Sequence, residues 1–407
     1  MRFIFFIILL FSLQAKTTVE KANAEKANQA TAELSAKTFV PTASMDGKIA
    51  NGVSTPAAAP TVAQNNLKVI ATLQNMQNRL KSKEDDELPK FDPNRELHPS
   101  DKDDSIPNLR QILQSLGYLE KATDSPFFDI ELETAVKAFQ ASHCLDADGV
   151  IGDDTKARLN WSYATRLKMI ADSIEKLKPL VFTKRTAIVN IPTYTMHVFE
   201  GHNLKMSMKA IVGQPKRPTP TMTSYINAVE INPSWVVPHT ILFEDKIPEI
   251  IKNVRYLKKN NLQIFDHDDN EVDPKDVDWE EADEHDFLYT LKQKPGAKNA
   301  LGRIRFNLVN NQEIYLHDTP LHNLFKKCSR SLSSGCIRLE KPVKLAAWLL
   351  GEEPDAIKEA IDTDDTTTKK LGKNMTVHIT YLQVWVEANG QVLWGADPYH
   401  LNPQPQT

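Results

Sequence analysis

The stretch that decides the fold runs from Ile314 to Arg338, I-Y-L-H-D-T-P-L-H-N-L-F-K-K-C-S-R-S-L-S-S-G-C-I-R. Its first residues alternate as in a strand, with Leu316 on one face and His317 on the other, before a Thr-Pro pair ends the pattern. Near its end a serine–glycine turn, in which glycine permits a sharp bend, presents Cys336. A reactive thiol needs a base to take its proton and a positive neighbour to favour the thiolate. His317 and Arg338 are the candidates for these two roles, so the stretch predicts a cysteine nucleophile.

Other interpretations of the same residues have less support. A free cysteine is most often an inert buried thiol, but a histidine at a strand end and a nearby arginine favour a nucleophile at Cys336. Cys328 is expected in the core or on a helix, with a redox partnership with Cys336 as the alternative. Four residues could be drawn as a zinc set, but no C-x-x-C or H-E-x-x-H spacing supports it, so we expect no metal. These four are His317, His322, Cys328 and Cys336.

Composition and length indicate a soluble protein of several domains. The chain has 407 residues, for which two or three domains are expected. Its 41% hydrophobic and 25% charged residues are ordinary for a globular protein. The net charge of −4 gives no basic surface, so we expect no nucleic-acid partner. Three cysteines, an odd count, indicate at least one free thiol if the chain is exported.

The N-terminus predicts export. Residues 1–15 carry one positive charge, Arg2, then an unbroken apolar run and a small residue at Ala15, as in a secretory signal peptide. The apolar run is short for a membrane span, and an uncleaved anchor is the alternative. Residues 16–103 are mostly a low-complexity leader and linker, apart from a short helical pattern over 67–80.

Three helices are predicted next. A helix begins near Ile106 and stops at Gly117, a second carries Leu132 and Phe139, and a third begins near Asp153 after an Asp-Gly turn. An amphipathic connecting helix follows over 161–180.

Strands dominate the rest of the chain. Patterns over 187–191 and 195–199 predict a hairpin, and further strands are predicted at 208–212, 225–229 and 303–306. Between them, residues 238–299 read as an insertion that begins with a helix over 241–257 and continues as an acidic segment. After a helix at 343–350, a final hairpin is predicted between 377–381 and 384–386.

Two resemblances follow from these motifs. The segments L-R-Q-I-L-Q-S-L-G-Y-L (109–119), T-A-V-K-A-F-Q (134–140) and D-A-D-G-V-I-G-D-D-T-K-A-R-L (146–159) resemble a three-helix peptidoglycan-binding domain. One departure is Cys144, where such domains often have glycine, and a helical domain that binds only protein is the alternative. H-D-T-P (317–320) with C-S-R-S-L-S-S-G-C-I-R (328–338) resembles the YkuD-type L,D-transpeptidases, bacterial cysteine enzymes that cross-link peptidoglycan. Flanking stretches such as I-N-P-S-W-V-V-P (231–238) resemble the YcbB-like branch from about Arg166 onward.

The second resemblance implies roles for seven residues. Cys336 matches the family nucleophile, His317 the general acid/base, and Gly335 the turn whose amides stabilise the tetrahedral intermediate. Arg338 matches the arginine that follows the nucleophile. Three positions match the substrate pocket: Ser334, Tyr315 and Trp235.

Two departures from the family pattern leave the orienting group of His317 open. Many relatives have histidine where Ser334 stands and glycine where Asp318 stands. We expect a backbone carbonyl, rather than the Asp318 carboxylate, to orient His317.

The implied reaction is acyl transfer through a cysteine thioester, with peptidoglycan tetrapeptide stems as substrate, 3→3 cross-links as product and no cofactor. The implied location is the periplasm of a Gram-negative bacterium, in association with the cell wall, with other cell-wall synthases as expected partners. Three alternatives remain: an L,D-carboxypeptidase, an enzyme that attaches or detaches envelope proteins, and a non-enzymatic peptidoglycan-binding protein.

The expected fold is thus α+β and multidomain, with a mainly-β catalytic domain that carries an inserted capping subdomain. The expected segments are a signal peptide (1–15), a leader and linker (16–103), a peptidoglycan-binding domain (104–160), a connecting helix (161–182), a catalytic domain (183–350, with the capping insertion at 238–299) and a C-terminal hairpin that completes the catalytic unit (351–407).

Overall fold

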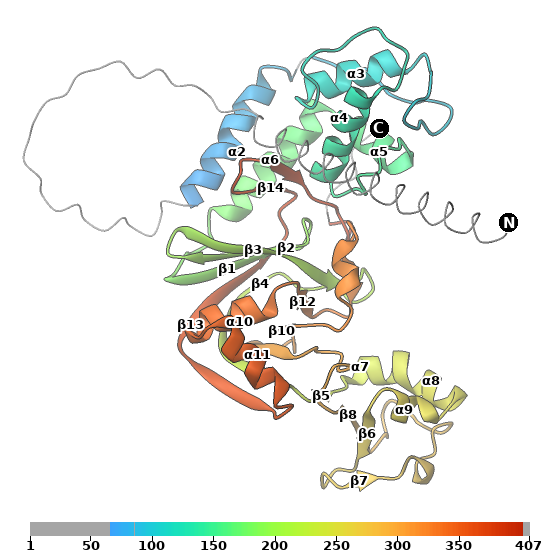
Figure 1. Ribbon diagram of the computed structural model, residues 1–407, viewed down its shortest axis with the longest axis vertical. Coiled ribbons are helices and arrows are strands. Elements are labelled where there is room, and N and C mark those ends of the chain that lie inside the picture. The colour runs from blue at the N-terminus through green and yellow to red at the C-terminus, as the bar shows by residue number, and fades with distance from the viewer. Residues whose placement is uncertain (1–65, 85, 402–407) are drawn as a thin grey trace, which may run out of the picture. The chain divides into compact units, whose positions relative to one another are not determined.

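The computed structural model describes residues 66–84 and 86–401 (Figure 1). The predicted signal peptide and most of the predicted leader lie outside these residues. Within the described part of the chain, no helix is both long and apolar enough to span a membrane.

A helical region precedes the strands, as predicted. Its helices are α2 (Asn66–Lys81), α3 (Ile106–Ser115), α4 (Ile130–Ser142), α5 (Asp153–Leu159) and α6 (Tyr163–Leu177). Asp129 caps α4 by accepting a hydrogen bond from the Leu132 amide at 3.0 Å, which satisfies one of the free donors of the first turn. Helices α3, α4 and α5 share one apolar core, in which Leu109, Leu132 and Phe139 are fully buried. The three-helix prediction is therefore confirmed for this segment.

One nine-stranded sheet forms the centre of the second region. Its order is β11-β3-β12-β10-β9-β4-β13-β1-β2, and β2 also pairs with β3, so the sheet closes on itself into a barrel-like core. The strands are β1 (Arg185–Asn190), β2 (Thr195–Glu200), β3 (Asn203–Gly213), β4 (Met222–Ile231), β9 (Ile304–Leu308), β10 (Leu316–His317), β11 (Ser331–Ser333), β12 (Ile337–Leu339) and β13 (Thr367–Thr380). Helices α10 (Pro342–Leu350) and α11 (Pro354–Asp362) pack their apolar residues onto this sheet.

The predicted insertion is a folded subdomain with its own core, here called the cap (residues 238–299). Its sheet has the order β5-β8-β6-β7 and contains the cap strands β6 (Leu262–Phe265), β7 (Glu271–Val272) and β8 (Thr290–Gln293), joined by β5 (Trp235–Val236), which lies just before the cap. The predicted continuous helix is instead broken into α7 (His239–Ile241), a π-helical segment (Leu242–Lys246), α8 (Ile247–Lys252) and α9 (Arg255–Lys259). Pro248 near the start of α8 lacks the amide that a continuous helix needs, which accounts for one of the breaks.

The cap is closed at its base by side chains that bind backbone carbonyls. The buried Asn299 amide donates to the carbonyl oxygens of Pro233 at 3.0 Å and Lys294 at 2.9 Å. The two ends of the insertion are thereby held together, so the cap leaves and re-enters the sheet at one place.

The predicted C-terminal hairpin is wrong. β13 lies inside the sheet, antiparallel to β4 and parallel to β1, so both of its edges are already hydrogen-bonded and it cannot pair with the segment that follows. The Asn190 side chain accepts from the Leu382 amide at 2.9 Å and directs the chain away from the sheet. β14 (Val384–Val386) pairs instead with β15 (Val392–Trp394), with Asn389 and Gly390 in the turn between them.

Candidate active site

Two short parallel strands bring four of the predicted site residues together. β10 and β12 pair in parallel, with Leu316 opposite Ile337 and His317 opposite Arg338, and the Ile337 amide donates to the Tyr315 carbonyl at 3.1 Å. Leu316 and Ile337 are fully buried in the barrel core. Because side chains alternate along a strand, the neighbours of Leu316 and Ile337 lie on the opposite face, and these neighbours are the four site residues. These are Tyr315, His317, Cys336 and Arg338.

The His317 imidazole is buried and uncharged in this environment. Its side chain is buried at 4% relative exposure. Burial, with the positive charges of Arg338 and Arg305, lowers the pKa of His317 to about 3. Nearby backbone groups of Asp318 and Leu301 act in the opposite direction but are outweighed. The imidazole is therefore uncharged at neutral pH.

The Cys336 thiol is also neutral at rest. Burial raises the pKa of Cys336 above its usual value, although contacts with Tyr315 and the charge of Arg338 lower it. The sulfur contacts the Glu313 carbonyl at 3.6 Å. Arg338 thus acts in the predicted direction, but burial has the larger effect, so the site holds a thiol beside an imidazole rather than an ion pair.

The turn before the nucleophile is held by hydroxyl groups. Gly335 has φ of +113°, a conformation that other residues rarely adopt. Its carbonyl accepts from Thr219 Oγ1 at 2.7 Å, and its amide donates to Ser333 Oγ at 3.2 Å. Ser333 Oγ in turn donates to the Cys336 carbonyl at 2.6 Å. Hydrogen bonds therefore fix the backbone at Gly335 and at Cys336. The hydroxyl of Ser334, between Ser333 and Gly335, accepts from Arg217 Nη1 at 3.0 Å.

The proline-bearing loop after Gly213 is expected from the sequence, but its support of this turn is not. Residues 214–221 connect β3 to β4, and Thr219 Oγ1 accepts from the Gly213 amide at 2.8 Å. The hydroxyl of Tyr399, near the C-terminus, donates to the Gly213 carbonyl at 2.9 Å and accepts from the Thr219 amide at 3.0 Å. These partners are far apart in the chain, so spacing alone gives no signal for them.

Gly213 should tolerate no side chain. A Cβ at this position would lie 2.2 Å from the Arg217 carbonyl oxygen and 2.6 Å from the Thr219 nitrogen, both backbone atoms that cannot swing away. Gly213→Ala is therefore expected to lower stability by about 3 kcal/mol, with a fall in thermal midpoint, and to displace the loop behind the nucleophile. Gly372→Ala is the control, because nothing lies within 4 Å of the added carbon there. Equal thermal midpoints for the two variants would contradict this prediction.

Trp235 connects the site to the cap. It is 7% exposed and belongs to the cap core, against which Tyr315 also packs. Burial raises the pKa of the Tyr315 phenol above its usual range, while its contact with the Trp235 side chain acts in the opposite direction. The rings of Tyr315 and His317 meet edge to face at 5.7 Å between centroids. Trp235, Tyr315 and His317 thus form one continuous row of contacts.

The Asp318 carboxylate is engaged away from His317. Its Oδ2 accepts from the Arg303 amide at 2.8 Å, and its Oδ1 lies 3.8 Å from Nε2 of His322. The buried Nδ1 of His317 has no partner in hydrogen-bonding geometry among the described residues. The Asp318 carboxylate thus makes no hydrogen bond to His317 among the described residues, and orientation of the imidazole by a backbone carbonyl stays a prediction.

The remaining cysteines lie elsewhere. The Cys328 thiol donates to the Leu145 carbonyl at 2.9 Å, and Cys144 contacts the Pro192 carbonyl at 3.9 Å. Burial raises the pKa of Cys328 to about 11, so this thiol is unreactive at neutral pH.

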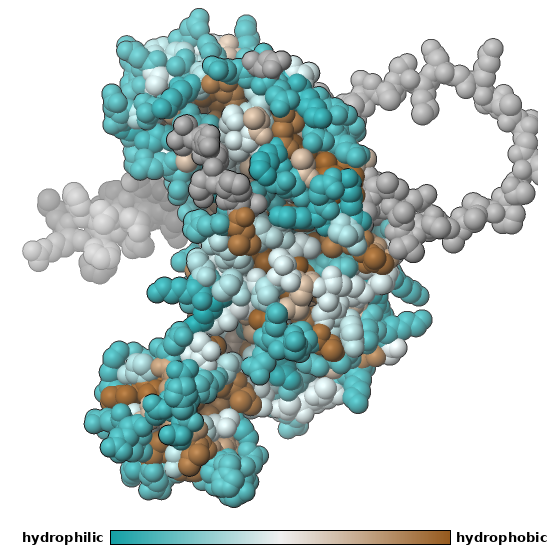
Figure 2. Space-filling model, turned by 180° about the vertical axis from the view of Figure 1, so that it is seen from behind, coloured by the Kyte–Doolittle hydropathy of each residue, from teal (hydrophilic) through white to brown (hydrophobic). Residues whose placement is uncertain are grey.

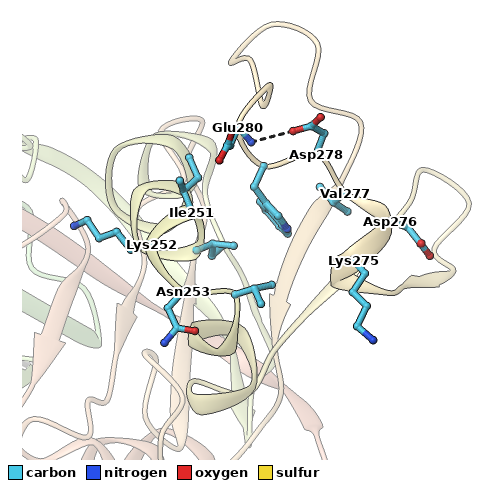
Figure 3. Close-up of a pocket in the computed structure, with 11 residues that line it drawn as sticks. Ile251, Lys252, Asn253, Lys275, Asp276, Val277, Asp278 and Glu280 are labelled. Atoms are coloured by element: carbon cyan, nitrogen blue, oxygen red, sulfur yellow. Dashed lines mark hydrogen bonds between the residues drawn. The ribbon is translucent and has the colours of Figure 1, made fainter.

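A cavity of about 590 Å³ lies in the cap, and none of the predicted site residues lines it (Figure 3). Residues 250–254 form one wall and residues 275–280 the other. The cap also exposes hydrophobic side chains to solvent, and brown patches are visible on it at the lower left of Figure 2. The exposed hydrophobic residues of the cap include Ile251, Val254 and Leu288, and Val236 lies just before it.

Comparisons with known proteins find two matching families and one curated relative. Residues 184–379 match the YkuD family, described as the L,D-transpeptidase catalytic domain, and residues 102–159 match a family described as "Putative peptidoglycan binding domain". A curated protein of Haemophilus influenzae, named "Putative L,D-transpeptidase", is 34% identical over 238 residues, which are 58% of this chain and 48% of that protein. The chain therefore spans about half the length of this curated relative.

Two solved structures are more distant relatives. An L,D-transpeptidase from Mycobacterium smegmatis is 15% identical over 48% of this chain and 58% of its own, with a TM-score of 0.24. An L,D-transpeptidase (Yku) from Stackebrandtia nassauensis is 14% identical over 72% of this chain and 96% of its own, with a TM-score of 0.29. Because both scores lie below 0.5, these likenesses do not by themselves establish a shared fold. The two family matches identify the chain as one with a YkuD-type L,D-transpeptidase catalytic domain, preceded by a peptidoglycan-binding domain.

Proposed function

We propose that this chain is a peptidoglycan L,D-transpeptidase that forms 3→3 cross-links between diaminopimelate residues of stem peptides. The observation that carries the proposal is the parallel pairing of β10 and β12, which puts His317 and Cys336 on the same face inside the YkuD domain. No metal or organic cofactor takes part in the proposed chemistry. The peptidoglycan-binding domain supports a cell-wall location, and we propose that this location is the periplasm of a Gram-negative bacterium.

The first half of the reaction forms a thioester. Cys336 Sγ attacks the carbonyl carbon of the amide between diaminopimelate and the terminal D-alanine of a tetrapeptide stem. His317 takes the thiol proton during this attack and then gives it to the departing amine, so the C–N bond breaks and D-alanine leaves. A neutral base suits this step, because it can accept the proton without first losing one.

The second half transfers the acyl group. The side-chain amine of another stem's diaminopimelate attacks the thioester, His317 takes its proton, and the Cys336 thiol is restored. The developing oxyanion in both halves needs amide donors. The Gly335 amide already donates to Ser333 Oγ, so the Cys336 amide is the donor we assign first, and Gly335 joins it only if that bond is released. Arg338 adds positive charge beside the reacting sulfur.

The test is incubation of purified protein with disaccharide-tetrapeptide and analysis of the products by mass spectrometry. A 3→3 linked dimer with release of D-alanine supports the proposal. Tripeptide alone, formed by water in place of the amine, assigns L,D-carboxypeptidase activity instead. Coupling only to lysine-bearing proteins assigns envelope-protein attachment, and no turnover of any of these leaves a peptidoglycan-binding structural protein.

A further inference from the structure

Arg217 joins three parts of the molecule through one guanidinium. It lies on the loop between β3 and β4, and its side chain is 13% exposed. On one side Nη1 donates to Ser334 Oγ at 3.0 Å, one residue from the glycine of the nucleophile turn. On the other side the same group binds two carboxylates of the cap. Nη1 and Nη2 donate to the two oxygens of Asp245 at 2.8 and 3.0 Å, and Nε donates to Glu244 at 3.1 Å.

The two carboxylates come from the first part of the cap that follows the sheet. Glu244 and Asp245 lie in the π-helical segment 242–246, which continues directly into α8. Both carboxylates bind the loop of the catalytic domain directly, with no other cap residue in between. This segment is therefore connected to Arg217 by ion pairs, and through Arg217 to Ser334 by a hydrogen bond.

The catalytic side of this contact is rigid, whereas the cap side is open to water. The Arg217 loop is fixed by Thr219, which binds both Gly213 and Gly335, and by Tyr399. Glu244 and Asp245 are 60% and 42% exposed, so water competes for them and each ion pair contributes little, on the order of 1 kcal/mol or less. A planar guanidinium that binds one carboxylate through two parallel bonds gives the contact a defined geometry, which lysine does not reproduce.

We infer that Arg217 is a positioning residue that latches the cap to the nucleophile turn. In the latched state the cap carboxylates and the Ser334 hydroxyl are held by the same guanidinium, so the position of the cap and the alignment of the turn are coupled. When the two carboxylates are released, the cap and the alignment of the turn are no longer coupled. The consequence for catalysis depends on the proposed function, but the latch itself does not.

The first experiment measures the latch without reference to turnover. Hydrogen exchange is followed by mass spectrometry in peptides that cover residues 239–260, and alkylation of Cys336 by iodoacetamide is followed by intact mass. Arg217→Gln and the double variant Glu244→Gln/Asp245→Asn are each expected to speed exchange in this segment roughly fivefold. Both variants should also alkylate faster at Cys336, and Arg217→Lys should lie between Arg217→Gln and the unmodified chain.

The control is Glu249→Gln. Glu249 forms an exposed ion pair with Lys252 within α8, so its loss removes the same kind of charge from the cap without touching the catalytic domain. This variant should leave exchange in 239–260 and Cys336 alkylation unchanged within a factor of two. Unchanged exchange in a folded Arg217→Gln variant, or an equal increase in Glu249→Gln, would overturn the latch.

The second experiment connects the latch to catalysis. If the latch holds the closed state during acyl transfer, Arg217→Gln should raise the ratio of hydrolysed tripeptide to cross-linked dimer, because water reaches the thioester. A purely structural arginine would lower the thermal midpoint and the total rate without changing this ratio, and that result would overturn the coupling. If the unmodified chain makes no dimer while the exchange and alkylation responses persist, the proposed function fails and the latch stands.

Discussion

Cys336→Ala is expected to lower the rate of dimer formation by about four orders of magnitude or more, because no other group in the site can form the thioester. Folding should be almost unaffected. The polar contacts of the Cys336 sulfur are weak, 3.6 Å to the Glu313 carbonyl and a further contact with Tyr315, so the stability change should stay within about 1 kcal/mol. The measurements are D-alanine release and dimer yield by mass spectrometry, with thermal unfolding as the check on the fold.

Cys328→Ala is the matched control for loss of a thiol. The Cys328 thiol donates to the Leu145 carbonyl and has a pKa raised to about 11, so it should contribute nothing to acyl transfer. Its variant should retain the rate of the unmodified chain and should still form a covalent adduct with substrate at Cys336. Full activity in Cys336→Ala, or an adduct on Cys328 in that variant, would assign the nucleophile elsewhere.

Local pattern predicted the reacting face because that face depends only on alternation along two short strands. Leu316 and Ile337 are fully buried, so their neighbours His317 and Arg338 must point the other way. The strand patterns at 187–191 and 195–199 predicted the β1–β2 hairpin for the same reason, and the structure pairs these strands as expected. Each of these predictions concerns residues that are near in sequence or share a strong motif.

What the sequence did not predict depends on contacts between distant segments. β13 looks like half of a terminal hairpin when read locally, yet it pairs with β1 and β4, which lie more than a hundred residues away. Tyr399 supports Thr219 behind the nucleophile turn, and no spacing rule connects these positions. The cap strands β6 to β8 were missed because they have four residues or fewer, which is too short for alternation to give a clear signal.

Charge at the reacting pair also required the structure. Sequence analysis predicted that Arg338 would favour the thiolate, and its charge does lower the Cys336 pKa, but burial outweighs it. The same burial, with Arg338, lowers the His317 pKa to about 3. A sequence can indicate which groups are neighbours, whereas the balance of desolvation and charge depends on how much of each group is covered.

This balance leads to a pH dependence that separates two mechanisms. In an ion-pair mechanism the thiolate is already formed, and activity falls where the histidine of the pair loses its proton. In the neutral mechanism expected here, His317 is uncharged at any pH well above 3, and the Cys336 thiol keeps its proton up to a pH above its usual value. The rate of D-alanine release in a single turnover should therefore be flat from about pH 5 to pH 8. Alkylation of Cys336 without substrate should be slower at pH 7 than that of a free cysteine and should rise with pH.

His317→Gln should lower this single-turnover rate by about two to four orders of magnitude. It should also replace the flat profile with a rate that rises with pH, since only hydroxide can then remove the thiol proton, or a thiolate formed in solution can attack.

Arg338→Gln tests the cause of the neutral imidazole. Loss of the positive charge raises the pKa of His317, so the acid limb should move upward from about pH 3, while Arg338→Lys, which keeps the charge, should preserve the flat profile. A fall in the rate of the unmodified chain between pH 7 and pH 6 would contradict this prediction. It would show that the imidazole is already protonated in that range and cannot accept the proton of the thiol.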